Sequence, residues 1–155
     1  HIIQIEKGQA KAPNLVKLLS NDNILKLFHF GRFDIAILFS TFGVITSPVY
    51  CTKIASKIAR TYTDRHGLKN LLSEILDVDI SKQQQSSDWG AKHLSKAQIE
   101  YAATDVLYLH ALREKLNEML TRENRSELAN ECFKFLPSRA VLDIKGWNDI
   151  DIFEH

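Results

Sequence analysis

The sequence predicts an α/β layer fold, because short apolar segments are each followed by a helical pattern. The clearest segment, 24–30, is a nearly continuous apolar run of the kind found in buried parallel strands. Gly31 marks a turn, and 32–42 then places apolar residues at helical spacing. A weaker strand pattern over 44–51 precedes a basic helical pattern over 52–60. Two such strand–helix units indicate a sheet covered by helices.

The elements before this unit are short. Residues 1–5 are apolar and rich in β-branched side chains, which predicts a strand. After a polar link, Pro13 suits the first turn of a helix that ends at about Leu19. The polar tetrapeptide 20–23 has the composition of a turn.

The middle of the chain alternates between helical and irregular patterns. Pro48, inside the second strand pattern, indicates an edge strand or a kink. We expect a polar loop over 62–67, a helix over 68–76 and an irregular segment over 77–91 that contains a glutamine and serine tract.

The sequence around Ser95 predicts the start of a helix. Ser95 and Gln98 have the spacing of a capping box, in which each side chain bonds the other residue's backbone N–H. An apolar series at helical spacing then predicts one helix that continues to about Met119. Tyr101 and Asp105 therefore lie on one face of this helix, one turn apart.

The C-terminal part predicts one more helix and a tail. The helix covers 127–135, and Pro137 is expected to end it. Residues 140–155 then form a tail in which Trp147 and Phe153 are the expected anchors.

Composition limits the class of protein. The 155 residues are 45% hydrophobic with a net charge of +1, which suits one globular domain and excludes neither a nucleic acid nor a small molecule as partner. Cys51 and Cys132 have no metal-knuckle spacing, so we interpret them as reduced, buried thiols of a cytoplasmic protein. No apolar run is long enough to span a membrane, and no signal peptide is visible.

Three side chains suggest chemistry. Asp34 falls in the first turn of the 32–42 helix, near the carboxyl end of a strand, where sites of open α/β sheets gather. A carboxylate can hold a hard cation, and a phenol can orient a water beside it, so Asp34, Tyr101 and Asp105 predict part of a metal-dependent nuclease site. Plainer explanations exist: helix-dipole stabilisation for Asp34, core packing for Tyr101 and solvation for Asp105. Asp105, however, lies beside an apolar stripe, where a carboxylate needs a partner.

The segments His29-Phe-Gly-Arg-Phe-Asp34, 86–89 (Ser-Ser-Asp-Trp) and 101–109 (Tyr-Ala-Ala-Thr-Asp-Val-Leu-Tyr-Leu), in this order, resemble ribonuclease D. This family belongs to the DEDD superfamily of 3′–5′ exonucleases, in the branch whose third motif carries tyrosine. The resemblance runs from residue 1 to about Met119. It implies a ribonuclease H-like fold, with a mixed sheet flanked by helices.

The family's first motif, Asp-x-Glu, has no counterpart upstream of Asp34. By the resemblance, 1–5 corresponds to the family's third strand and 24–30 to its fourth. The first two strands are then missing from this chain, and we expect that it was cut from a longer protein. We expect residues 1–155 to form a single, N-terminally incomplete exonuclease domain, with 124–155 as a helix and tail packed on it.

The resemblance also implies roles. Asp105 would ligate a metal directly, Asp34 would contribute to the metal shell partly through water, and Tyr101 would position the attacking water. The complete site would hold two Mg²⁺ or Mn²⁺ ions, for which an all-oxygen shell is suited.

Substrate contacts are expected from basic and aromatic residues, which suit single-stranded nucleic acid. The candidates are Lys82, Arg60, Arg65 and Trp89. The basic residues can equally form a solvated helix face, and Trp89 can be a packing anchor. His29 is interpreted as a satisfied histidine of the core.

The function we expect is a two-metal-ion 3′–5′ exoribonuclease, although this chain alone is expected to be inactive because the Asp-x-Glu motif is missing. The complete enzyme would trim the 3′ end of single-stranded RNA, such as tRNA or another structured RNA, and release nucleoside 5′-monophosphates. Two alternatives remain open: a catalytically incomplete nucleic-acid-binding module, and a DNA-directed 3′–5′ exonuclease.

Overall fold

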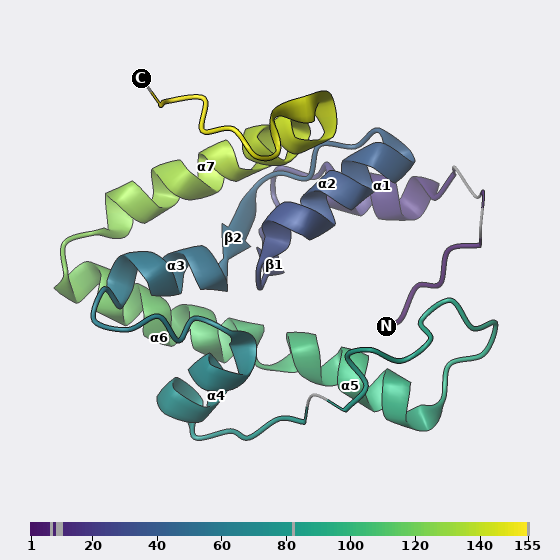
Figure 1. Cartoon of the computed structure of the whole chain (residues 1–155), viewed down its shortest axis with the longest axis horizontal. Coiled ribbons are helices and arrows are strands. Elements are labelled where there is room, and N and C mark those ends of the chain that lie inside the picture. The colour runs from purple at the N-terminus through teal and green to yellow at the C-terminus, as the bar shows by residue number, and fades with distance from the viewer. Residues whose placement is uncertain (7, 9–10, 82, 155) are drawn as a thin grey trace.

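The computed structural model describes residues 1–6, 8, 11–81 and 83–154. Its architecture is α/β, as predicted, with a small parallel sheet among helices (Figure 1). The elements in chain order are α1 (Pro13–Leu19), β1 (Lys26–Phe28), α2 (Gly31–Phe42), β2 (Val49–Cys51), α3 (Thr52–Ala59), α4 (Leu68–Leu76), α5 (Lys96–Leu107), α6 (Leu109–Arg122), α7 (Ser126–Leu142) and the π-helix η1 (Asp143–Trp147).

The sheet is the β1–α2–β2 unit that the sequence predicts. The two strands run parallel, with Lys26 opposite Val49 and Phe28 opposite Cys51. β2 is wholly buried, and α2 packs against α7. The strands occupy the centre of the molecule, between α7 and the lower layer of α3 and α6 (Figure 1).

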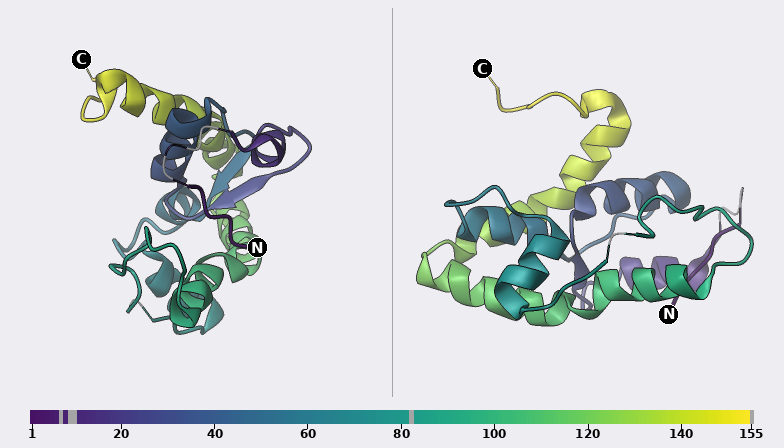
Figure 2. Two further views of the ribbon diagram at one scale, coloured as in Figure 1. Left: turned by 90° about the vertical axis from the view of Figure 1, so that its right-hand side faces the viewer. Right: turned by 60° about the horizontal axis from the view of Figure 1, so that its bottom comes forward.

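The hydrophobic core lies between α2, α3, α4, α6 and α7. Its largest fully buried aliphatic side chains are Ile35, Leu71, Leu72, Leu112 and Leu116. They come from α2, α4 and α6, so burial of apolar surface on these helices contributes to the driving force for folding. α5, which precedes α6 in the chain, runs in nearly the same direction as α6 but extends away from the core (Figure 2, right).

Three expected elements differ from the structure. Residues 1–5 form no strand; they have no neighbouring strand among the described residues, and the Gln4 amide donates instead to the Ala91 carbonyl at 3.3 Å. The helix from Ser95 breaks at Tyr108 into α5 and α6. Pro137 does not end the last helix but lies buried inside α7, which loses only one backbone donor there.

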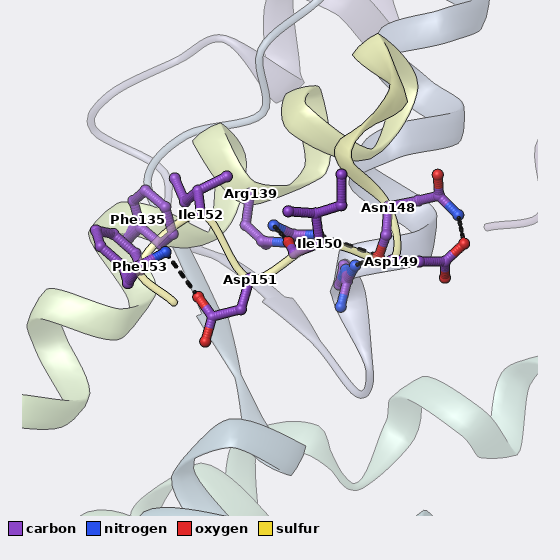
Figure 3. A pocket seen from close by; sticks show the side chains of 9 residues that line it. Phe135, Arg139, Asn148, Asp149, Ile150, Asp151, Ile152 and Phe153 are labelled. Carbon is purple, nitrogen blue, oxygen red and sulfur yellow. Dashed lines mark hydrogen bonds between the residues drawn. The ribbon is translucent and has the colours of Figure 1, made fainter. Parts of the chain in front are cut away.

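The C-terminal segment folds back on α2 and α7. Asp143 accepts two bonds from Arg32, at 2.6 and 2.7 Å, and one from Arg139 at 2.9 Å. Arg139 also donates to the carbonyls of residues 147, 148 and 150. Figure 3 shows this side of the molecule, where the Phe153 ring lies 5.8 Å from that of Phe135. Trp147, expected as an anchor, is 45% exposed and held through its carbonyl.

Among the described residues, no helix combines the length and the apolar character that crossing a membrane requires.

Candidate active site

A cavity of about 580 Å³ lies where the end of β1 and the start of α2 face α5. The three predicted catalytic residues, Asp34, Tyr101 and Asp105, all line it. The rest of its lining consists of Leu27, Phe28, His29, Phe30, Lys53, Gly67, Leu68, Lys69, Ile80, Ser81, Gln85, Val106 and Leu109. The structure thus brings together side chains that are about 70 residues apart in the sequence.

The turn between β1 and α2 positions Asp34. Phe30 takes the left-handed conformation, with φ of 63°, and reverses the chain directly before the helix. Gly31 follows because a Cβ atom there would meet the Phe28 Cβ at 2.6 Å. Asp34 then falls in the first turn of α2, where the helix dipole favours a negative charge. Partial desolvation nevertheless raises the pKa of this carboxyl group above its ordinary value.

The start of α5 positions Tyr101 and Asp105. The predicted capping box is present: Ser95 Oγ accepts from the Gln98 backbone N–H at 3.2 Å, and Gln98 Oε1 accepts from the Ser95 N–H at 2.9 Å. Burial raises the pKa of Asp105. Burial also raises the pKa of Tyr101, and the negative charge of Asp105 raises it further. The phenol and the carboxylate therefore lie within electrostatic reach of each other.

The two carboxylates suit a cation. Among the described residues, neither Asp34 nor Asp105 forms an ion pair, and both have raised pKa values because their charged forms are poorly solvated. A divalent ion would compensate these charges, and carboxylate oxygens are ligands that Mg²⁺ accepts. Two carboxylates are a sparse set, however: the described residues hold no group of three or more potential ligands.

His29 also faces this cavity, so its surroundings are not those of a simple core residue. Thr52 donates its hydroxyl to the Phe28 carbonyl at 3.2 Å, which leaves Thr52 Oγ1 to accept from His29 Nδ1–H at 2.9 Å. Burial, assisted by the charge of Lys53, lowers the pKa of His29 to about 4. The ring is therefore neutral at pH 7, with Nε2 free of a proton.

The expected substrate-binding arginines lie elsewhere. Arg60 is 3% exposed and forms an ion pair with Glu74, which also binds Arg65 at 3.0 Å. Neither arginine lines the cavity, where the cations are Lys53 and Lys69 instead. The sequence signal for these two lysines was present, since both belong to the basic stretch 52–69.

Of the other two expected contact residues, only Trp89 lies among the residues that the structure describes. Lys82 lies outside the described residues. Trp89 does not line the cavity, but its ring lies 6.0 Å from that of Tyr101. Gln98 holds the loop that carries Trp89, because its amide donates to the Asp88 carbonyl at 2.9 Å. Trp89 thus contacts a cavity residue from outside, as a packing anchor does.

Phe30 is a further cavity residue that the sequence interpretation did not select. Its ring is 54% exposed, and the Lys53 ammonium lies 3.8 Å from the ring centre. An aromatic residue directly before the turn glycine was the available signal, although only the structure shows its left-handed conformation.

The α/β fold, which carries the carboxylate-lined cavity at the end of β1, is of the ribonuclease H-like exonuclease type, as its similarity to solved structures shows. Residues 1–121 match the family model described as 3′-5′ exonuclease, and the chain belongs to this family. It is 39% identical over 125 residues to ribonuclease D of Acidiphilium cryptum, covering 81% of this chain and 31% of that protein. The chain spans about a third of the length of the curated relatives it matches.

Two solved structures are more similar still. Brucella melitensis NrnC with bound Mg²⁺ is 61% identical with a TM-score of 0.94, and the match covers 98% of this chain and 74% of that one. Brucella melitensis NrnC bound to pGG is 62% identical with a TM-score of 0.94 and the same coverage of both chains.

Proposed function

We propose that this chain carries the catalytic residues of a 3′–5′ exoribonuclease that acts on the 3′ end of single-stranded RNA and releases nucleoside 5′-monophosphates. The observation that carries this proposal is the convergence of Asp34 and Asp105 on one cavity, where both carboxylates have raised pKa values. Membership of the 3′-5′ exonuclease family and similarity to ribonuclease D support it. The choice of RNA as substrate rests on these names and on pGG in the NrnC structure.

Asp34 and Asp105 are the proposed ligands of Mg²⁺ or Mn²⁺, in keeping with the Mg²⁺ bound to NrnC. In this site the metal would supply activation of a water and stabilisation of charge on the leaving oxygen. Tyr101, one turn before Asp105, would orient that water through its hydroxyl. The hydroxyl of a tyrosine is protonated at pH 7, and the raised pKa of Tyr101 keeps it so, which allows it to donate a hydrogen bond. That residues 1–155 form one exonuclease domain stays a prediction. That the protein is cytoplasmic also stays a prediction.

A second function is favoured by one observation. Two-metal chemistry uses several carboxylates, and the described residues place only two in this cavity. The chain would then bind single-stranded nucleic acid without cleaving it. DNA in place of RNA is the remaining alternative, because no described contact reads a 2′-hydroxyl group.

The test is shortening of a 5′-labelled single-stranded RNA in the presence of Mg²⁺ or Mn²⁺. We expect the chain alone to cleave nothing. With an Asp-x-Glu segment added upstream of residue 1, we expect one-nucleotide steps from the 3′ end, release of 5′-monophosphates and no shortening by the Asp105→Asn variant of this extended chain. A DNA oligomer of the same sequence tests the preference for RNA. Binding of RNA without shortening, equal for the extended chain and for its Asp105→Asn variant, would select the binding module instead.

A further inference from the structure

Tyr101 has a side chain that no hydrogen bond fixes. Among the described residues, its hydroxyl group neither donates nor accepts one. Tyr101 lines the active-site cavity and also a smaller hollow of about 230 Å³, so open space adjoins its ring in both. Packing against neighbouring side chains must therefore set the direction of the ring. A group that orients a water needs a defined direction, because small displacements of a positioned group lower the rate of catalysis.

Trp89 supplies this packing. The centres of the Trp89 and Tyr101 rings lie 6.0 Å apart, with 45° between the ring planes, which is within the range of favourable aromatic pairs. Trp89 itself is 39% exposed and lies outside the hydrophobic core. It therefore contributes little to the core, and its aromatic contact is with a residue of the candidate active site.

Gln98 fixes the loop that carries Trp89. Its side chain is buried, and its amide donates to Ser87 Oγ at 3.1 Å and to the Asp88 carbonyl at 2.9 Å, directly before Trp89. Directly after Trp89, the Gly90 N–H donates to the Asp88 carboxylate at 2.9 Å. The backbone is thus held on both sides of the tryptophan.

These contacts begin and end on α5. Gln98 and Tyr101 are three residues apart, so they lie on one face of this helix. Gln98 holds the loop, and the loop carries Trp89 back onto Tyr101. Figure 1 shows this loop beside α5. Neither Gln98 nor Trp89 lines the active-site cavity, so both can affect it only through another residue.

We propose that Trp89 and Gln98 are positioning residues of the active site: Trp89 sets the direction of the Tyr101 ring, and Gln98 holds Trp89 in place. This inference rests on the proposed function, in which Tyr101 orients the attacking water. Because the contacts form within the chain itself, the ring is oriented before a substrate binds, and no reorganisation is needed during the reaction.

The first test is the alkaline titration of Tyr101 in this chain, followed by the ultraviolet absorbance of the phenolate. The chain has four tyrosines, so each titration is compared with that of the same chain carrying Tyr101→Phe. Burial raises the pKa of Tyr101, and Trp89→Ala should lower this pKa toward its ordinary value because water then reaches the ring. Trp89→Phe should retain most of the raised pKa. An unchanged pKa in Trp89→Ala would overturn the proposal.

Trp147→Ala is the matched control. It removes the other tryptophan of the chain, which is 45% exposed and lies in η1, away from the active-site cavity. The pKa of Tyr101 in this variant should equal that of the wild-type chain. An equal decrease in both tryptophan variants would overturn a specific contact between Trp89 and Tyr101.

A second pair of variants leaves Trp89 in place and keeps the test valid if Trp89→Ala does not fold. Gln98→Ala removes both bonds to the loop and should lower the pKa of Tyr101. Ser95→Ala removes only a helix cap and should leave this pKa unchanged. Equal pKa values in these two variants would overturn the role of Gln98.

Turnover separates positioning from substrate binding. In the chain extended upstream by an Asp-x-Glu segment, Trp89→Ala should lower kcat about tenfold, the scale expected for a displaced catalytic group, and leave KM for RNA nearly unchanged. Trp89→Phe should recover most of this loss. Equal changes of kcat/KM and KM, with kcat retained, would assign Trp89 to substrate binding and overturn the proposal.

The double variant shows whether Trp89 acts through Tyr101. In a chain that already carries Tyr101→Phe, Trp89→Ala should cause no further loss of kcat, and additive losses would contradict the proposal. The proposed function fails separately. An extended chain that shortens no RNA would contradict the exonuclease, whereas a lowered Tyr101 pKa in Trp89→Ala would still support the positioning contact.

Discussion

Arg32 and Asp143 are 111 residues apart in the sequence, yet their side chains form an ion pair that is joined by two hydrogen bonds. The pair joins the first turn of α2, two residues before Asp34, to the π-helix that follows α7. Arg32 holds the pKa of Asp143 below its ordinary value, and Arg139 adds to this effect. The C-terminal segment is therefore connected to the helix that presents a candidate metal ligand.

Asp143→Ala should lower the free energy of unfolding at pH 7 by about 1–2 kcal/mol, because hydrogen bonds to charged groups contribute about 1.5–3 kcal/mol and solvent screens this partly exposed pair. The measurement is urea unfolding of this variant, Arg32→Ala and the double variant. A coupling energy near zero in this cycle would show that the pair contributes nothing. Because the folded pKa is depressed, the contribution is present at neutral pH and lost as pH falls through that value.

Asp34→Asn and Asp105→Asn should each raise the free energy of unfolding at pH 7. Both carboxyl groups have raised pKa values in the folded chain, so their ionisation is more costly there than in the unfolded chain. Thermal unfolding without metal measures this gain. Mn²⁺ should then raise the unfolding temperature of the wild-type chain only. A variant that is destabilised, or that still responds to Mn²⁺, would contradict a ligand role.

His29→Asn should remove one contribution to the pH dependence of the free energy of unfolding. The pKa of His29 falls to about 4 on folding, so between pH 6.5 and 4 the unfolded chain binds more protons than the folded one. Stability therefore falls as pH drops through this window, by at most about 3 kcal/mol. Asn keeps an N–H donor for Thr52 but does not titrate. Urea unfolding of both chains at pH 4 to 7 checks this, and parallel curves would argue against it.

Gln98→Ala should destabilise α5 more than Ser95→Ala does. Loss of the Ser95 side chain removes one cap, which costs about 1 kcal/mol. Gln98 also donates to Ser87 Oγ and the Asp88 carbonyl, so its loss releases the loop that carries Trp89. Amide hydrogen exchange of residues 86–90 should accelerate in Gln98→Ala alone. Equal acceleration in both variants would assign the effect to helix capping.

Local chemistry explains which elements were predictable. The capping box at Ser95, the β1–α2 unit and Pro13 at a helix start depend on neighbouring residues, and all three were confirmed. The strand over 1–5 was wrong because a strand requires a partner, which residue types alone do not supply. Pro137 was misjudged for a similar reason: burial of α7 on both sides of it compensates the missing hydrogen bond.

The site was predictable where a motif carries it. Asp34, Tyr101 and Asp105 came from short motifs, and the structure places them in one cavity, although their catalytic roles stay predictions. The arginines were chosen by charge alone, and charge does not reveal an internal partner such as Glu74. The left-handed turn at Phe30 depends on how two elements meet, which no local pattern encodes.

The two-stranded sheet has one further consequence. Lys26 donates its N–H to the Pro48 carbonyl of the β2 side, so the alternation of a parallel ladder turns the Leu27 N–H the other way. Among the described residues no third strand lies on that flank. The backbone of Leu27 therefore forms an unpaired edge of the sheet, whose N–H and C=O groups are the kind that pair with an added strand.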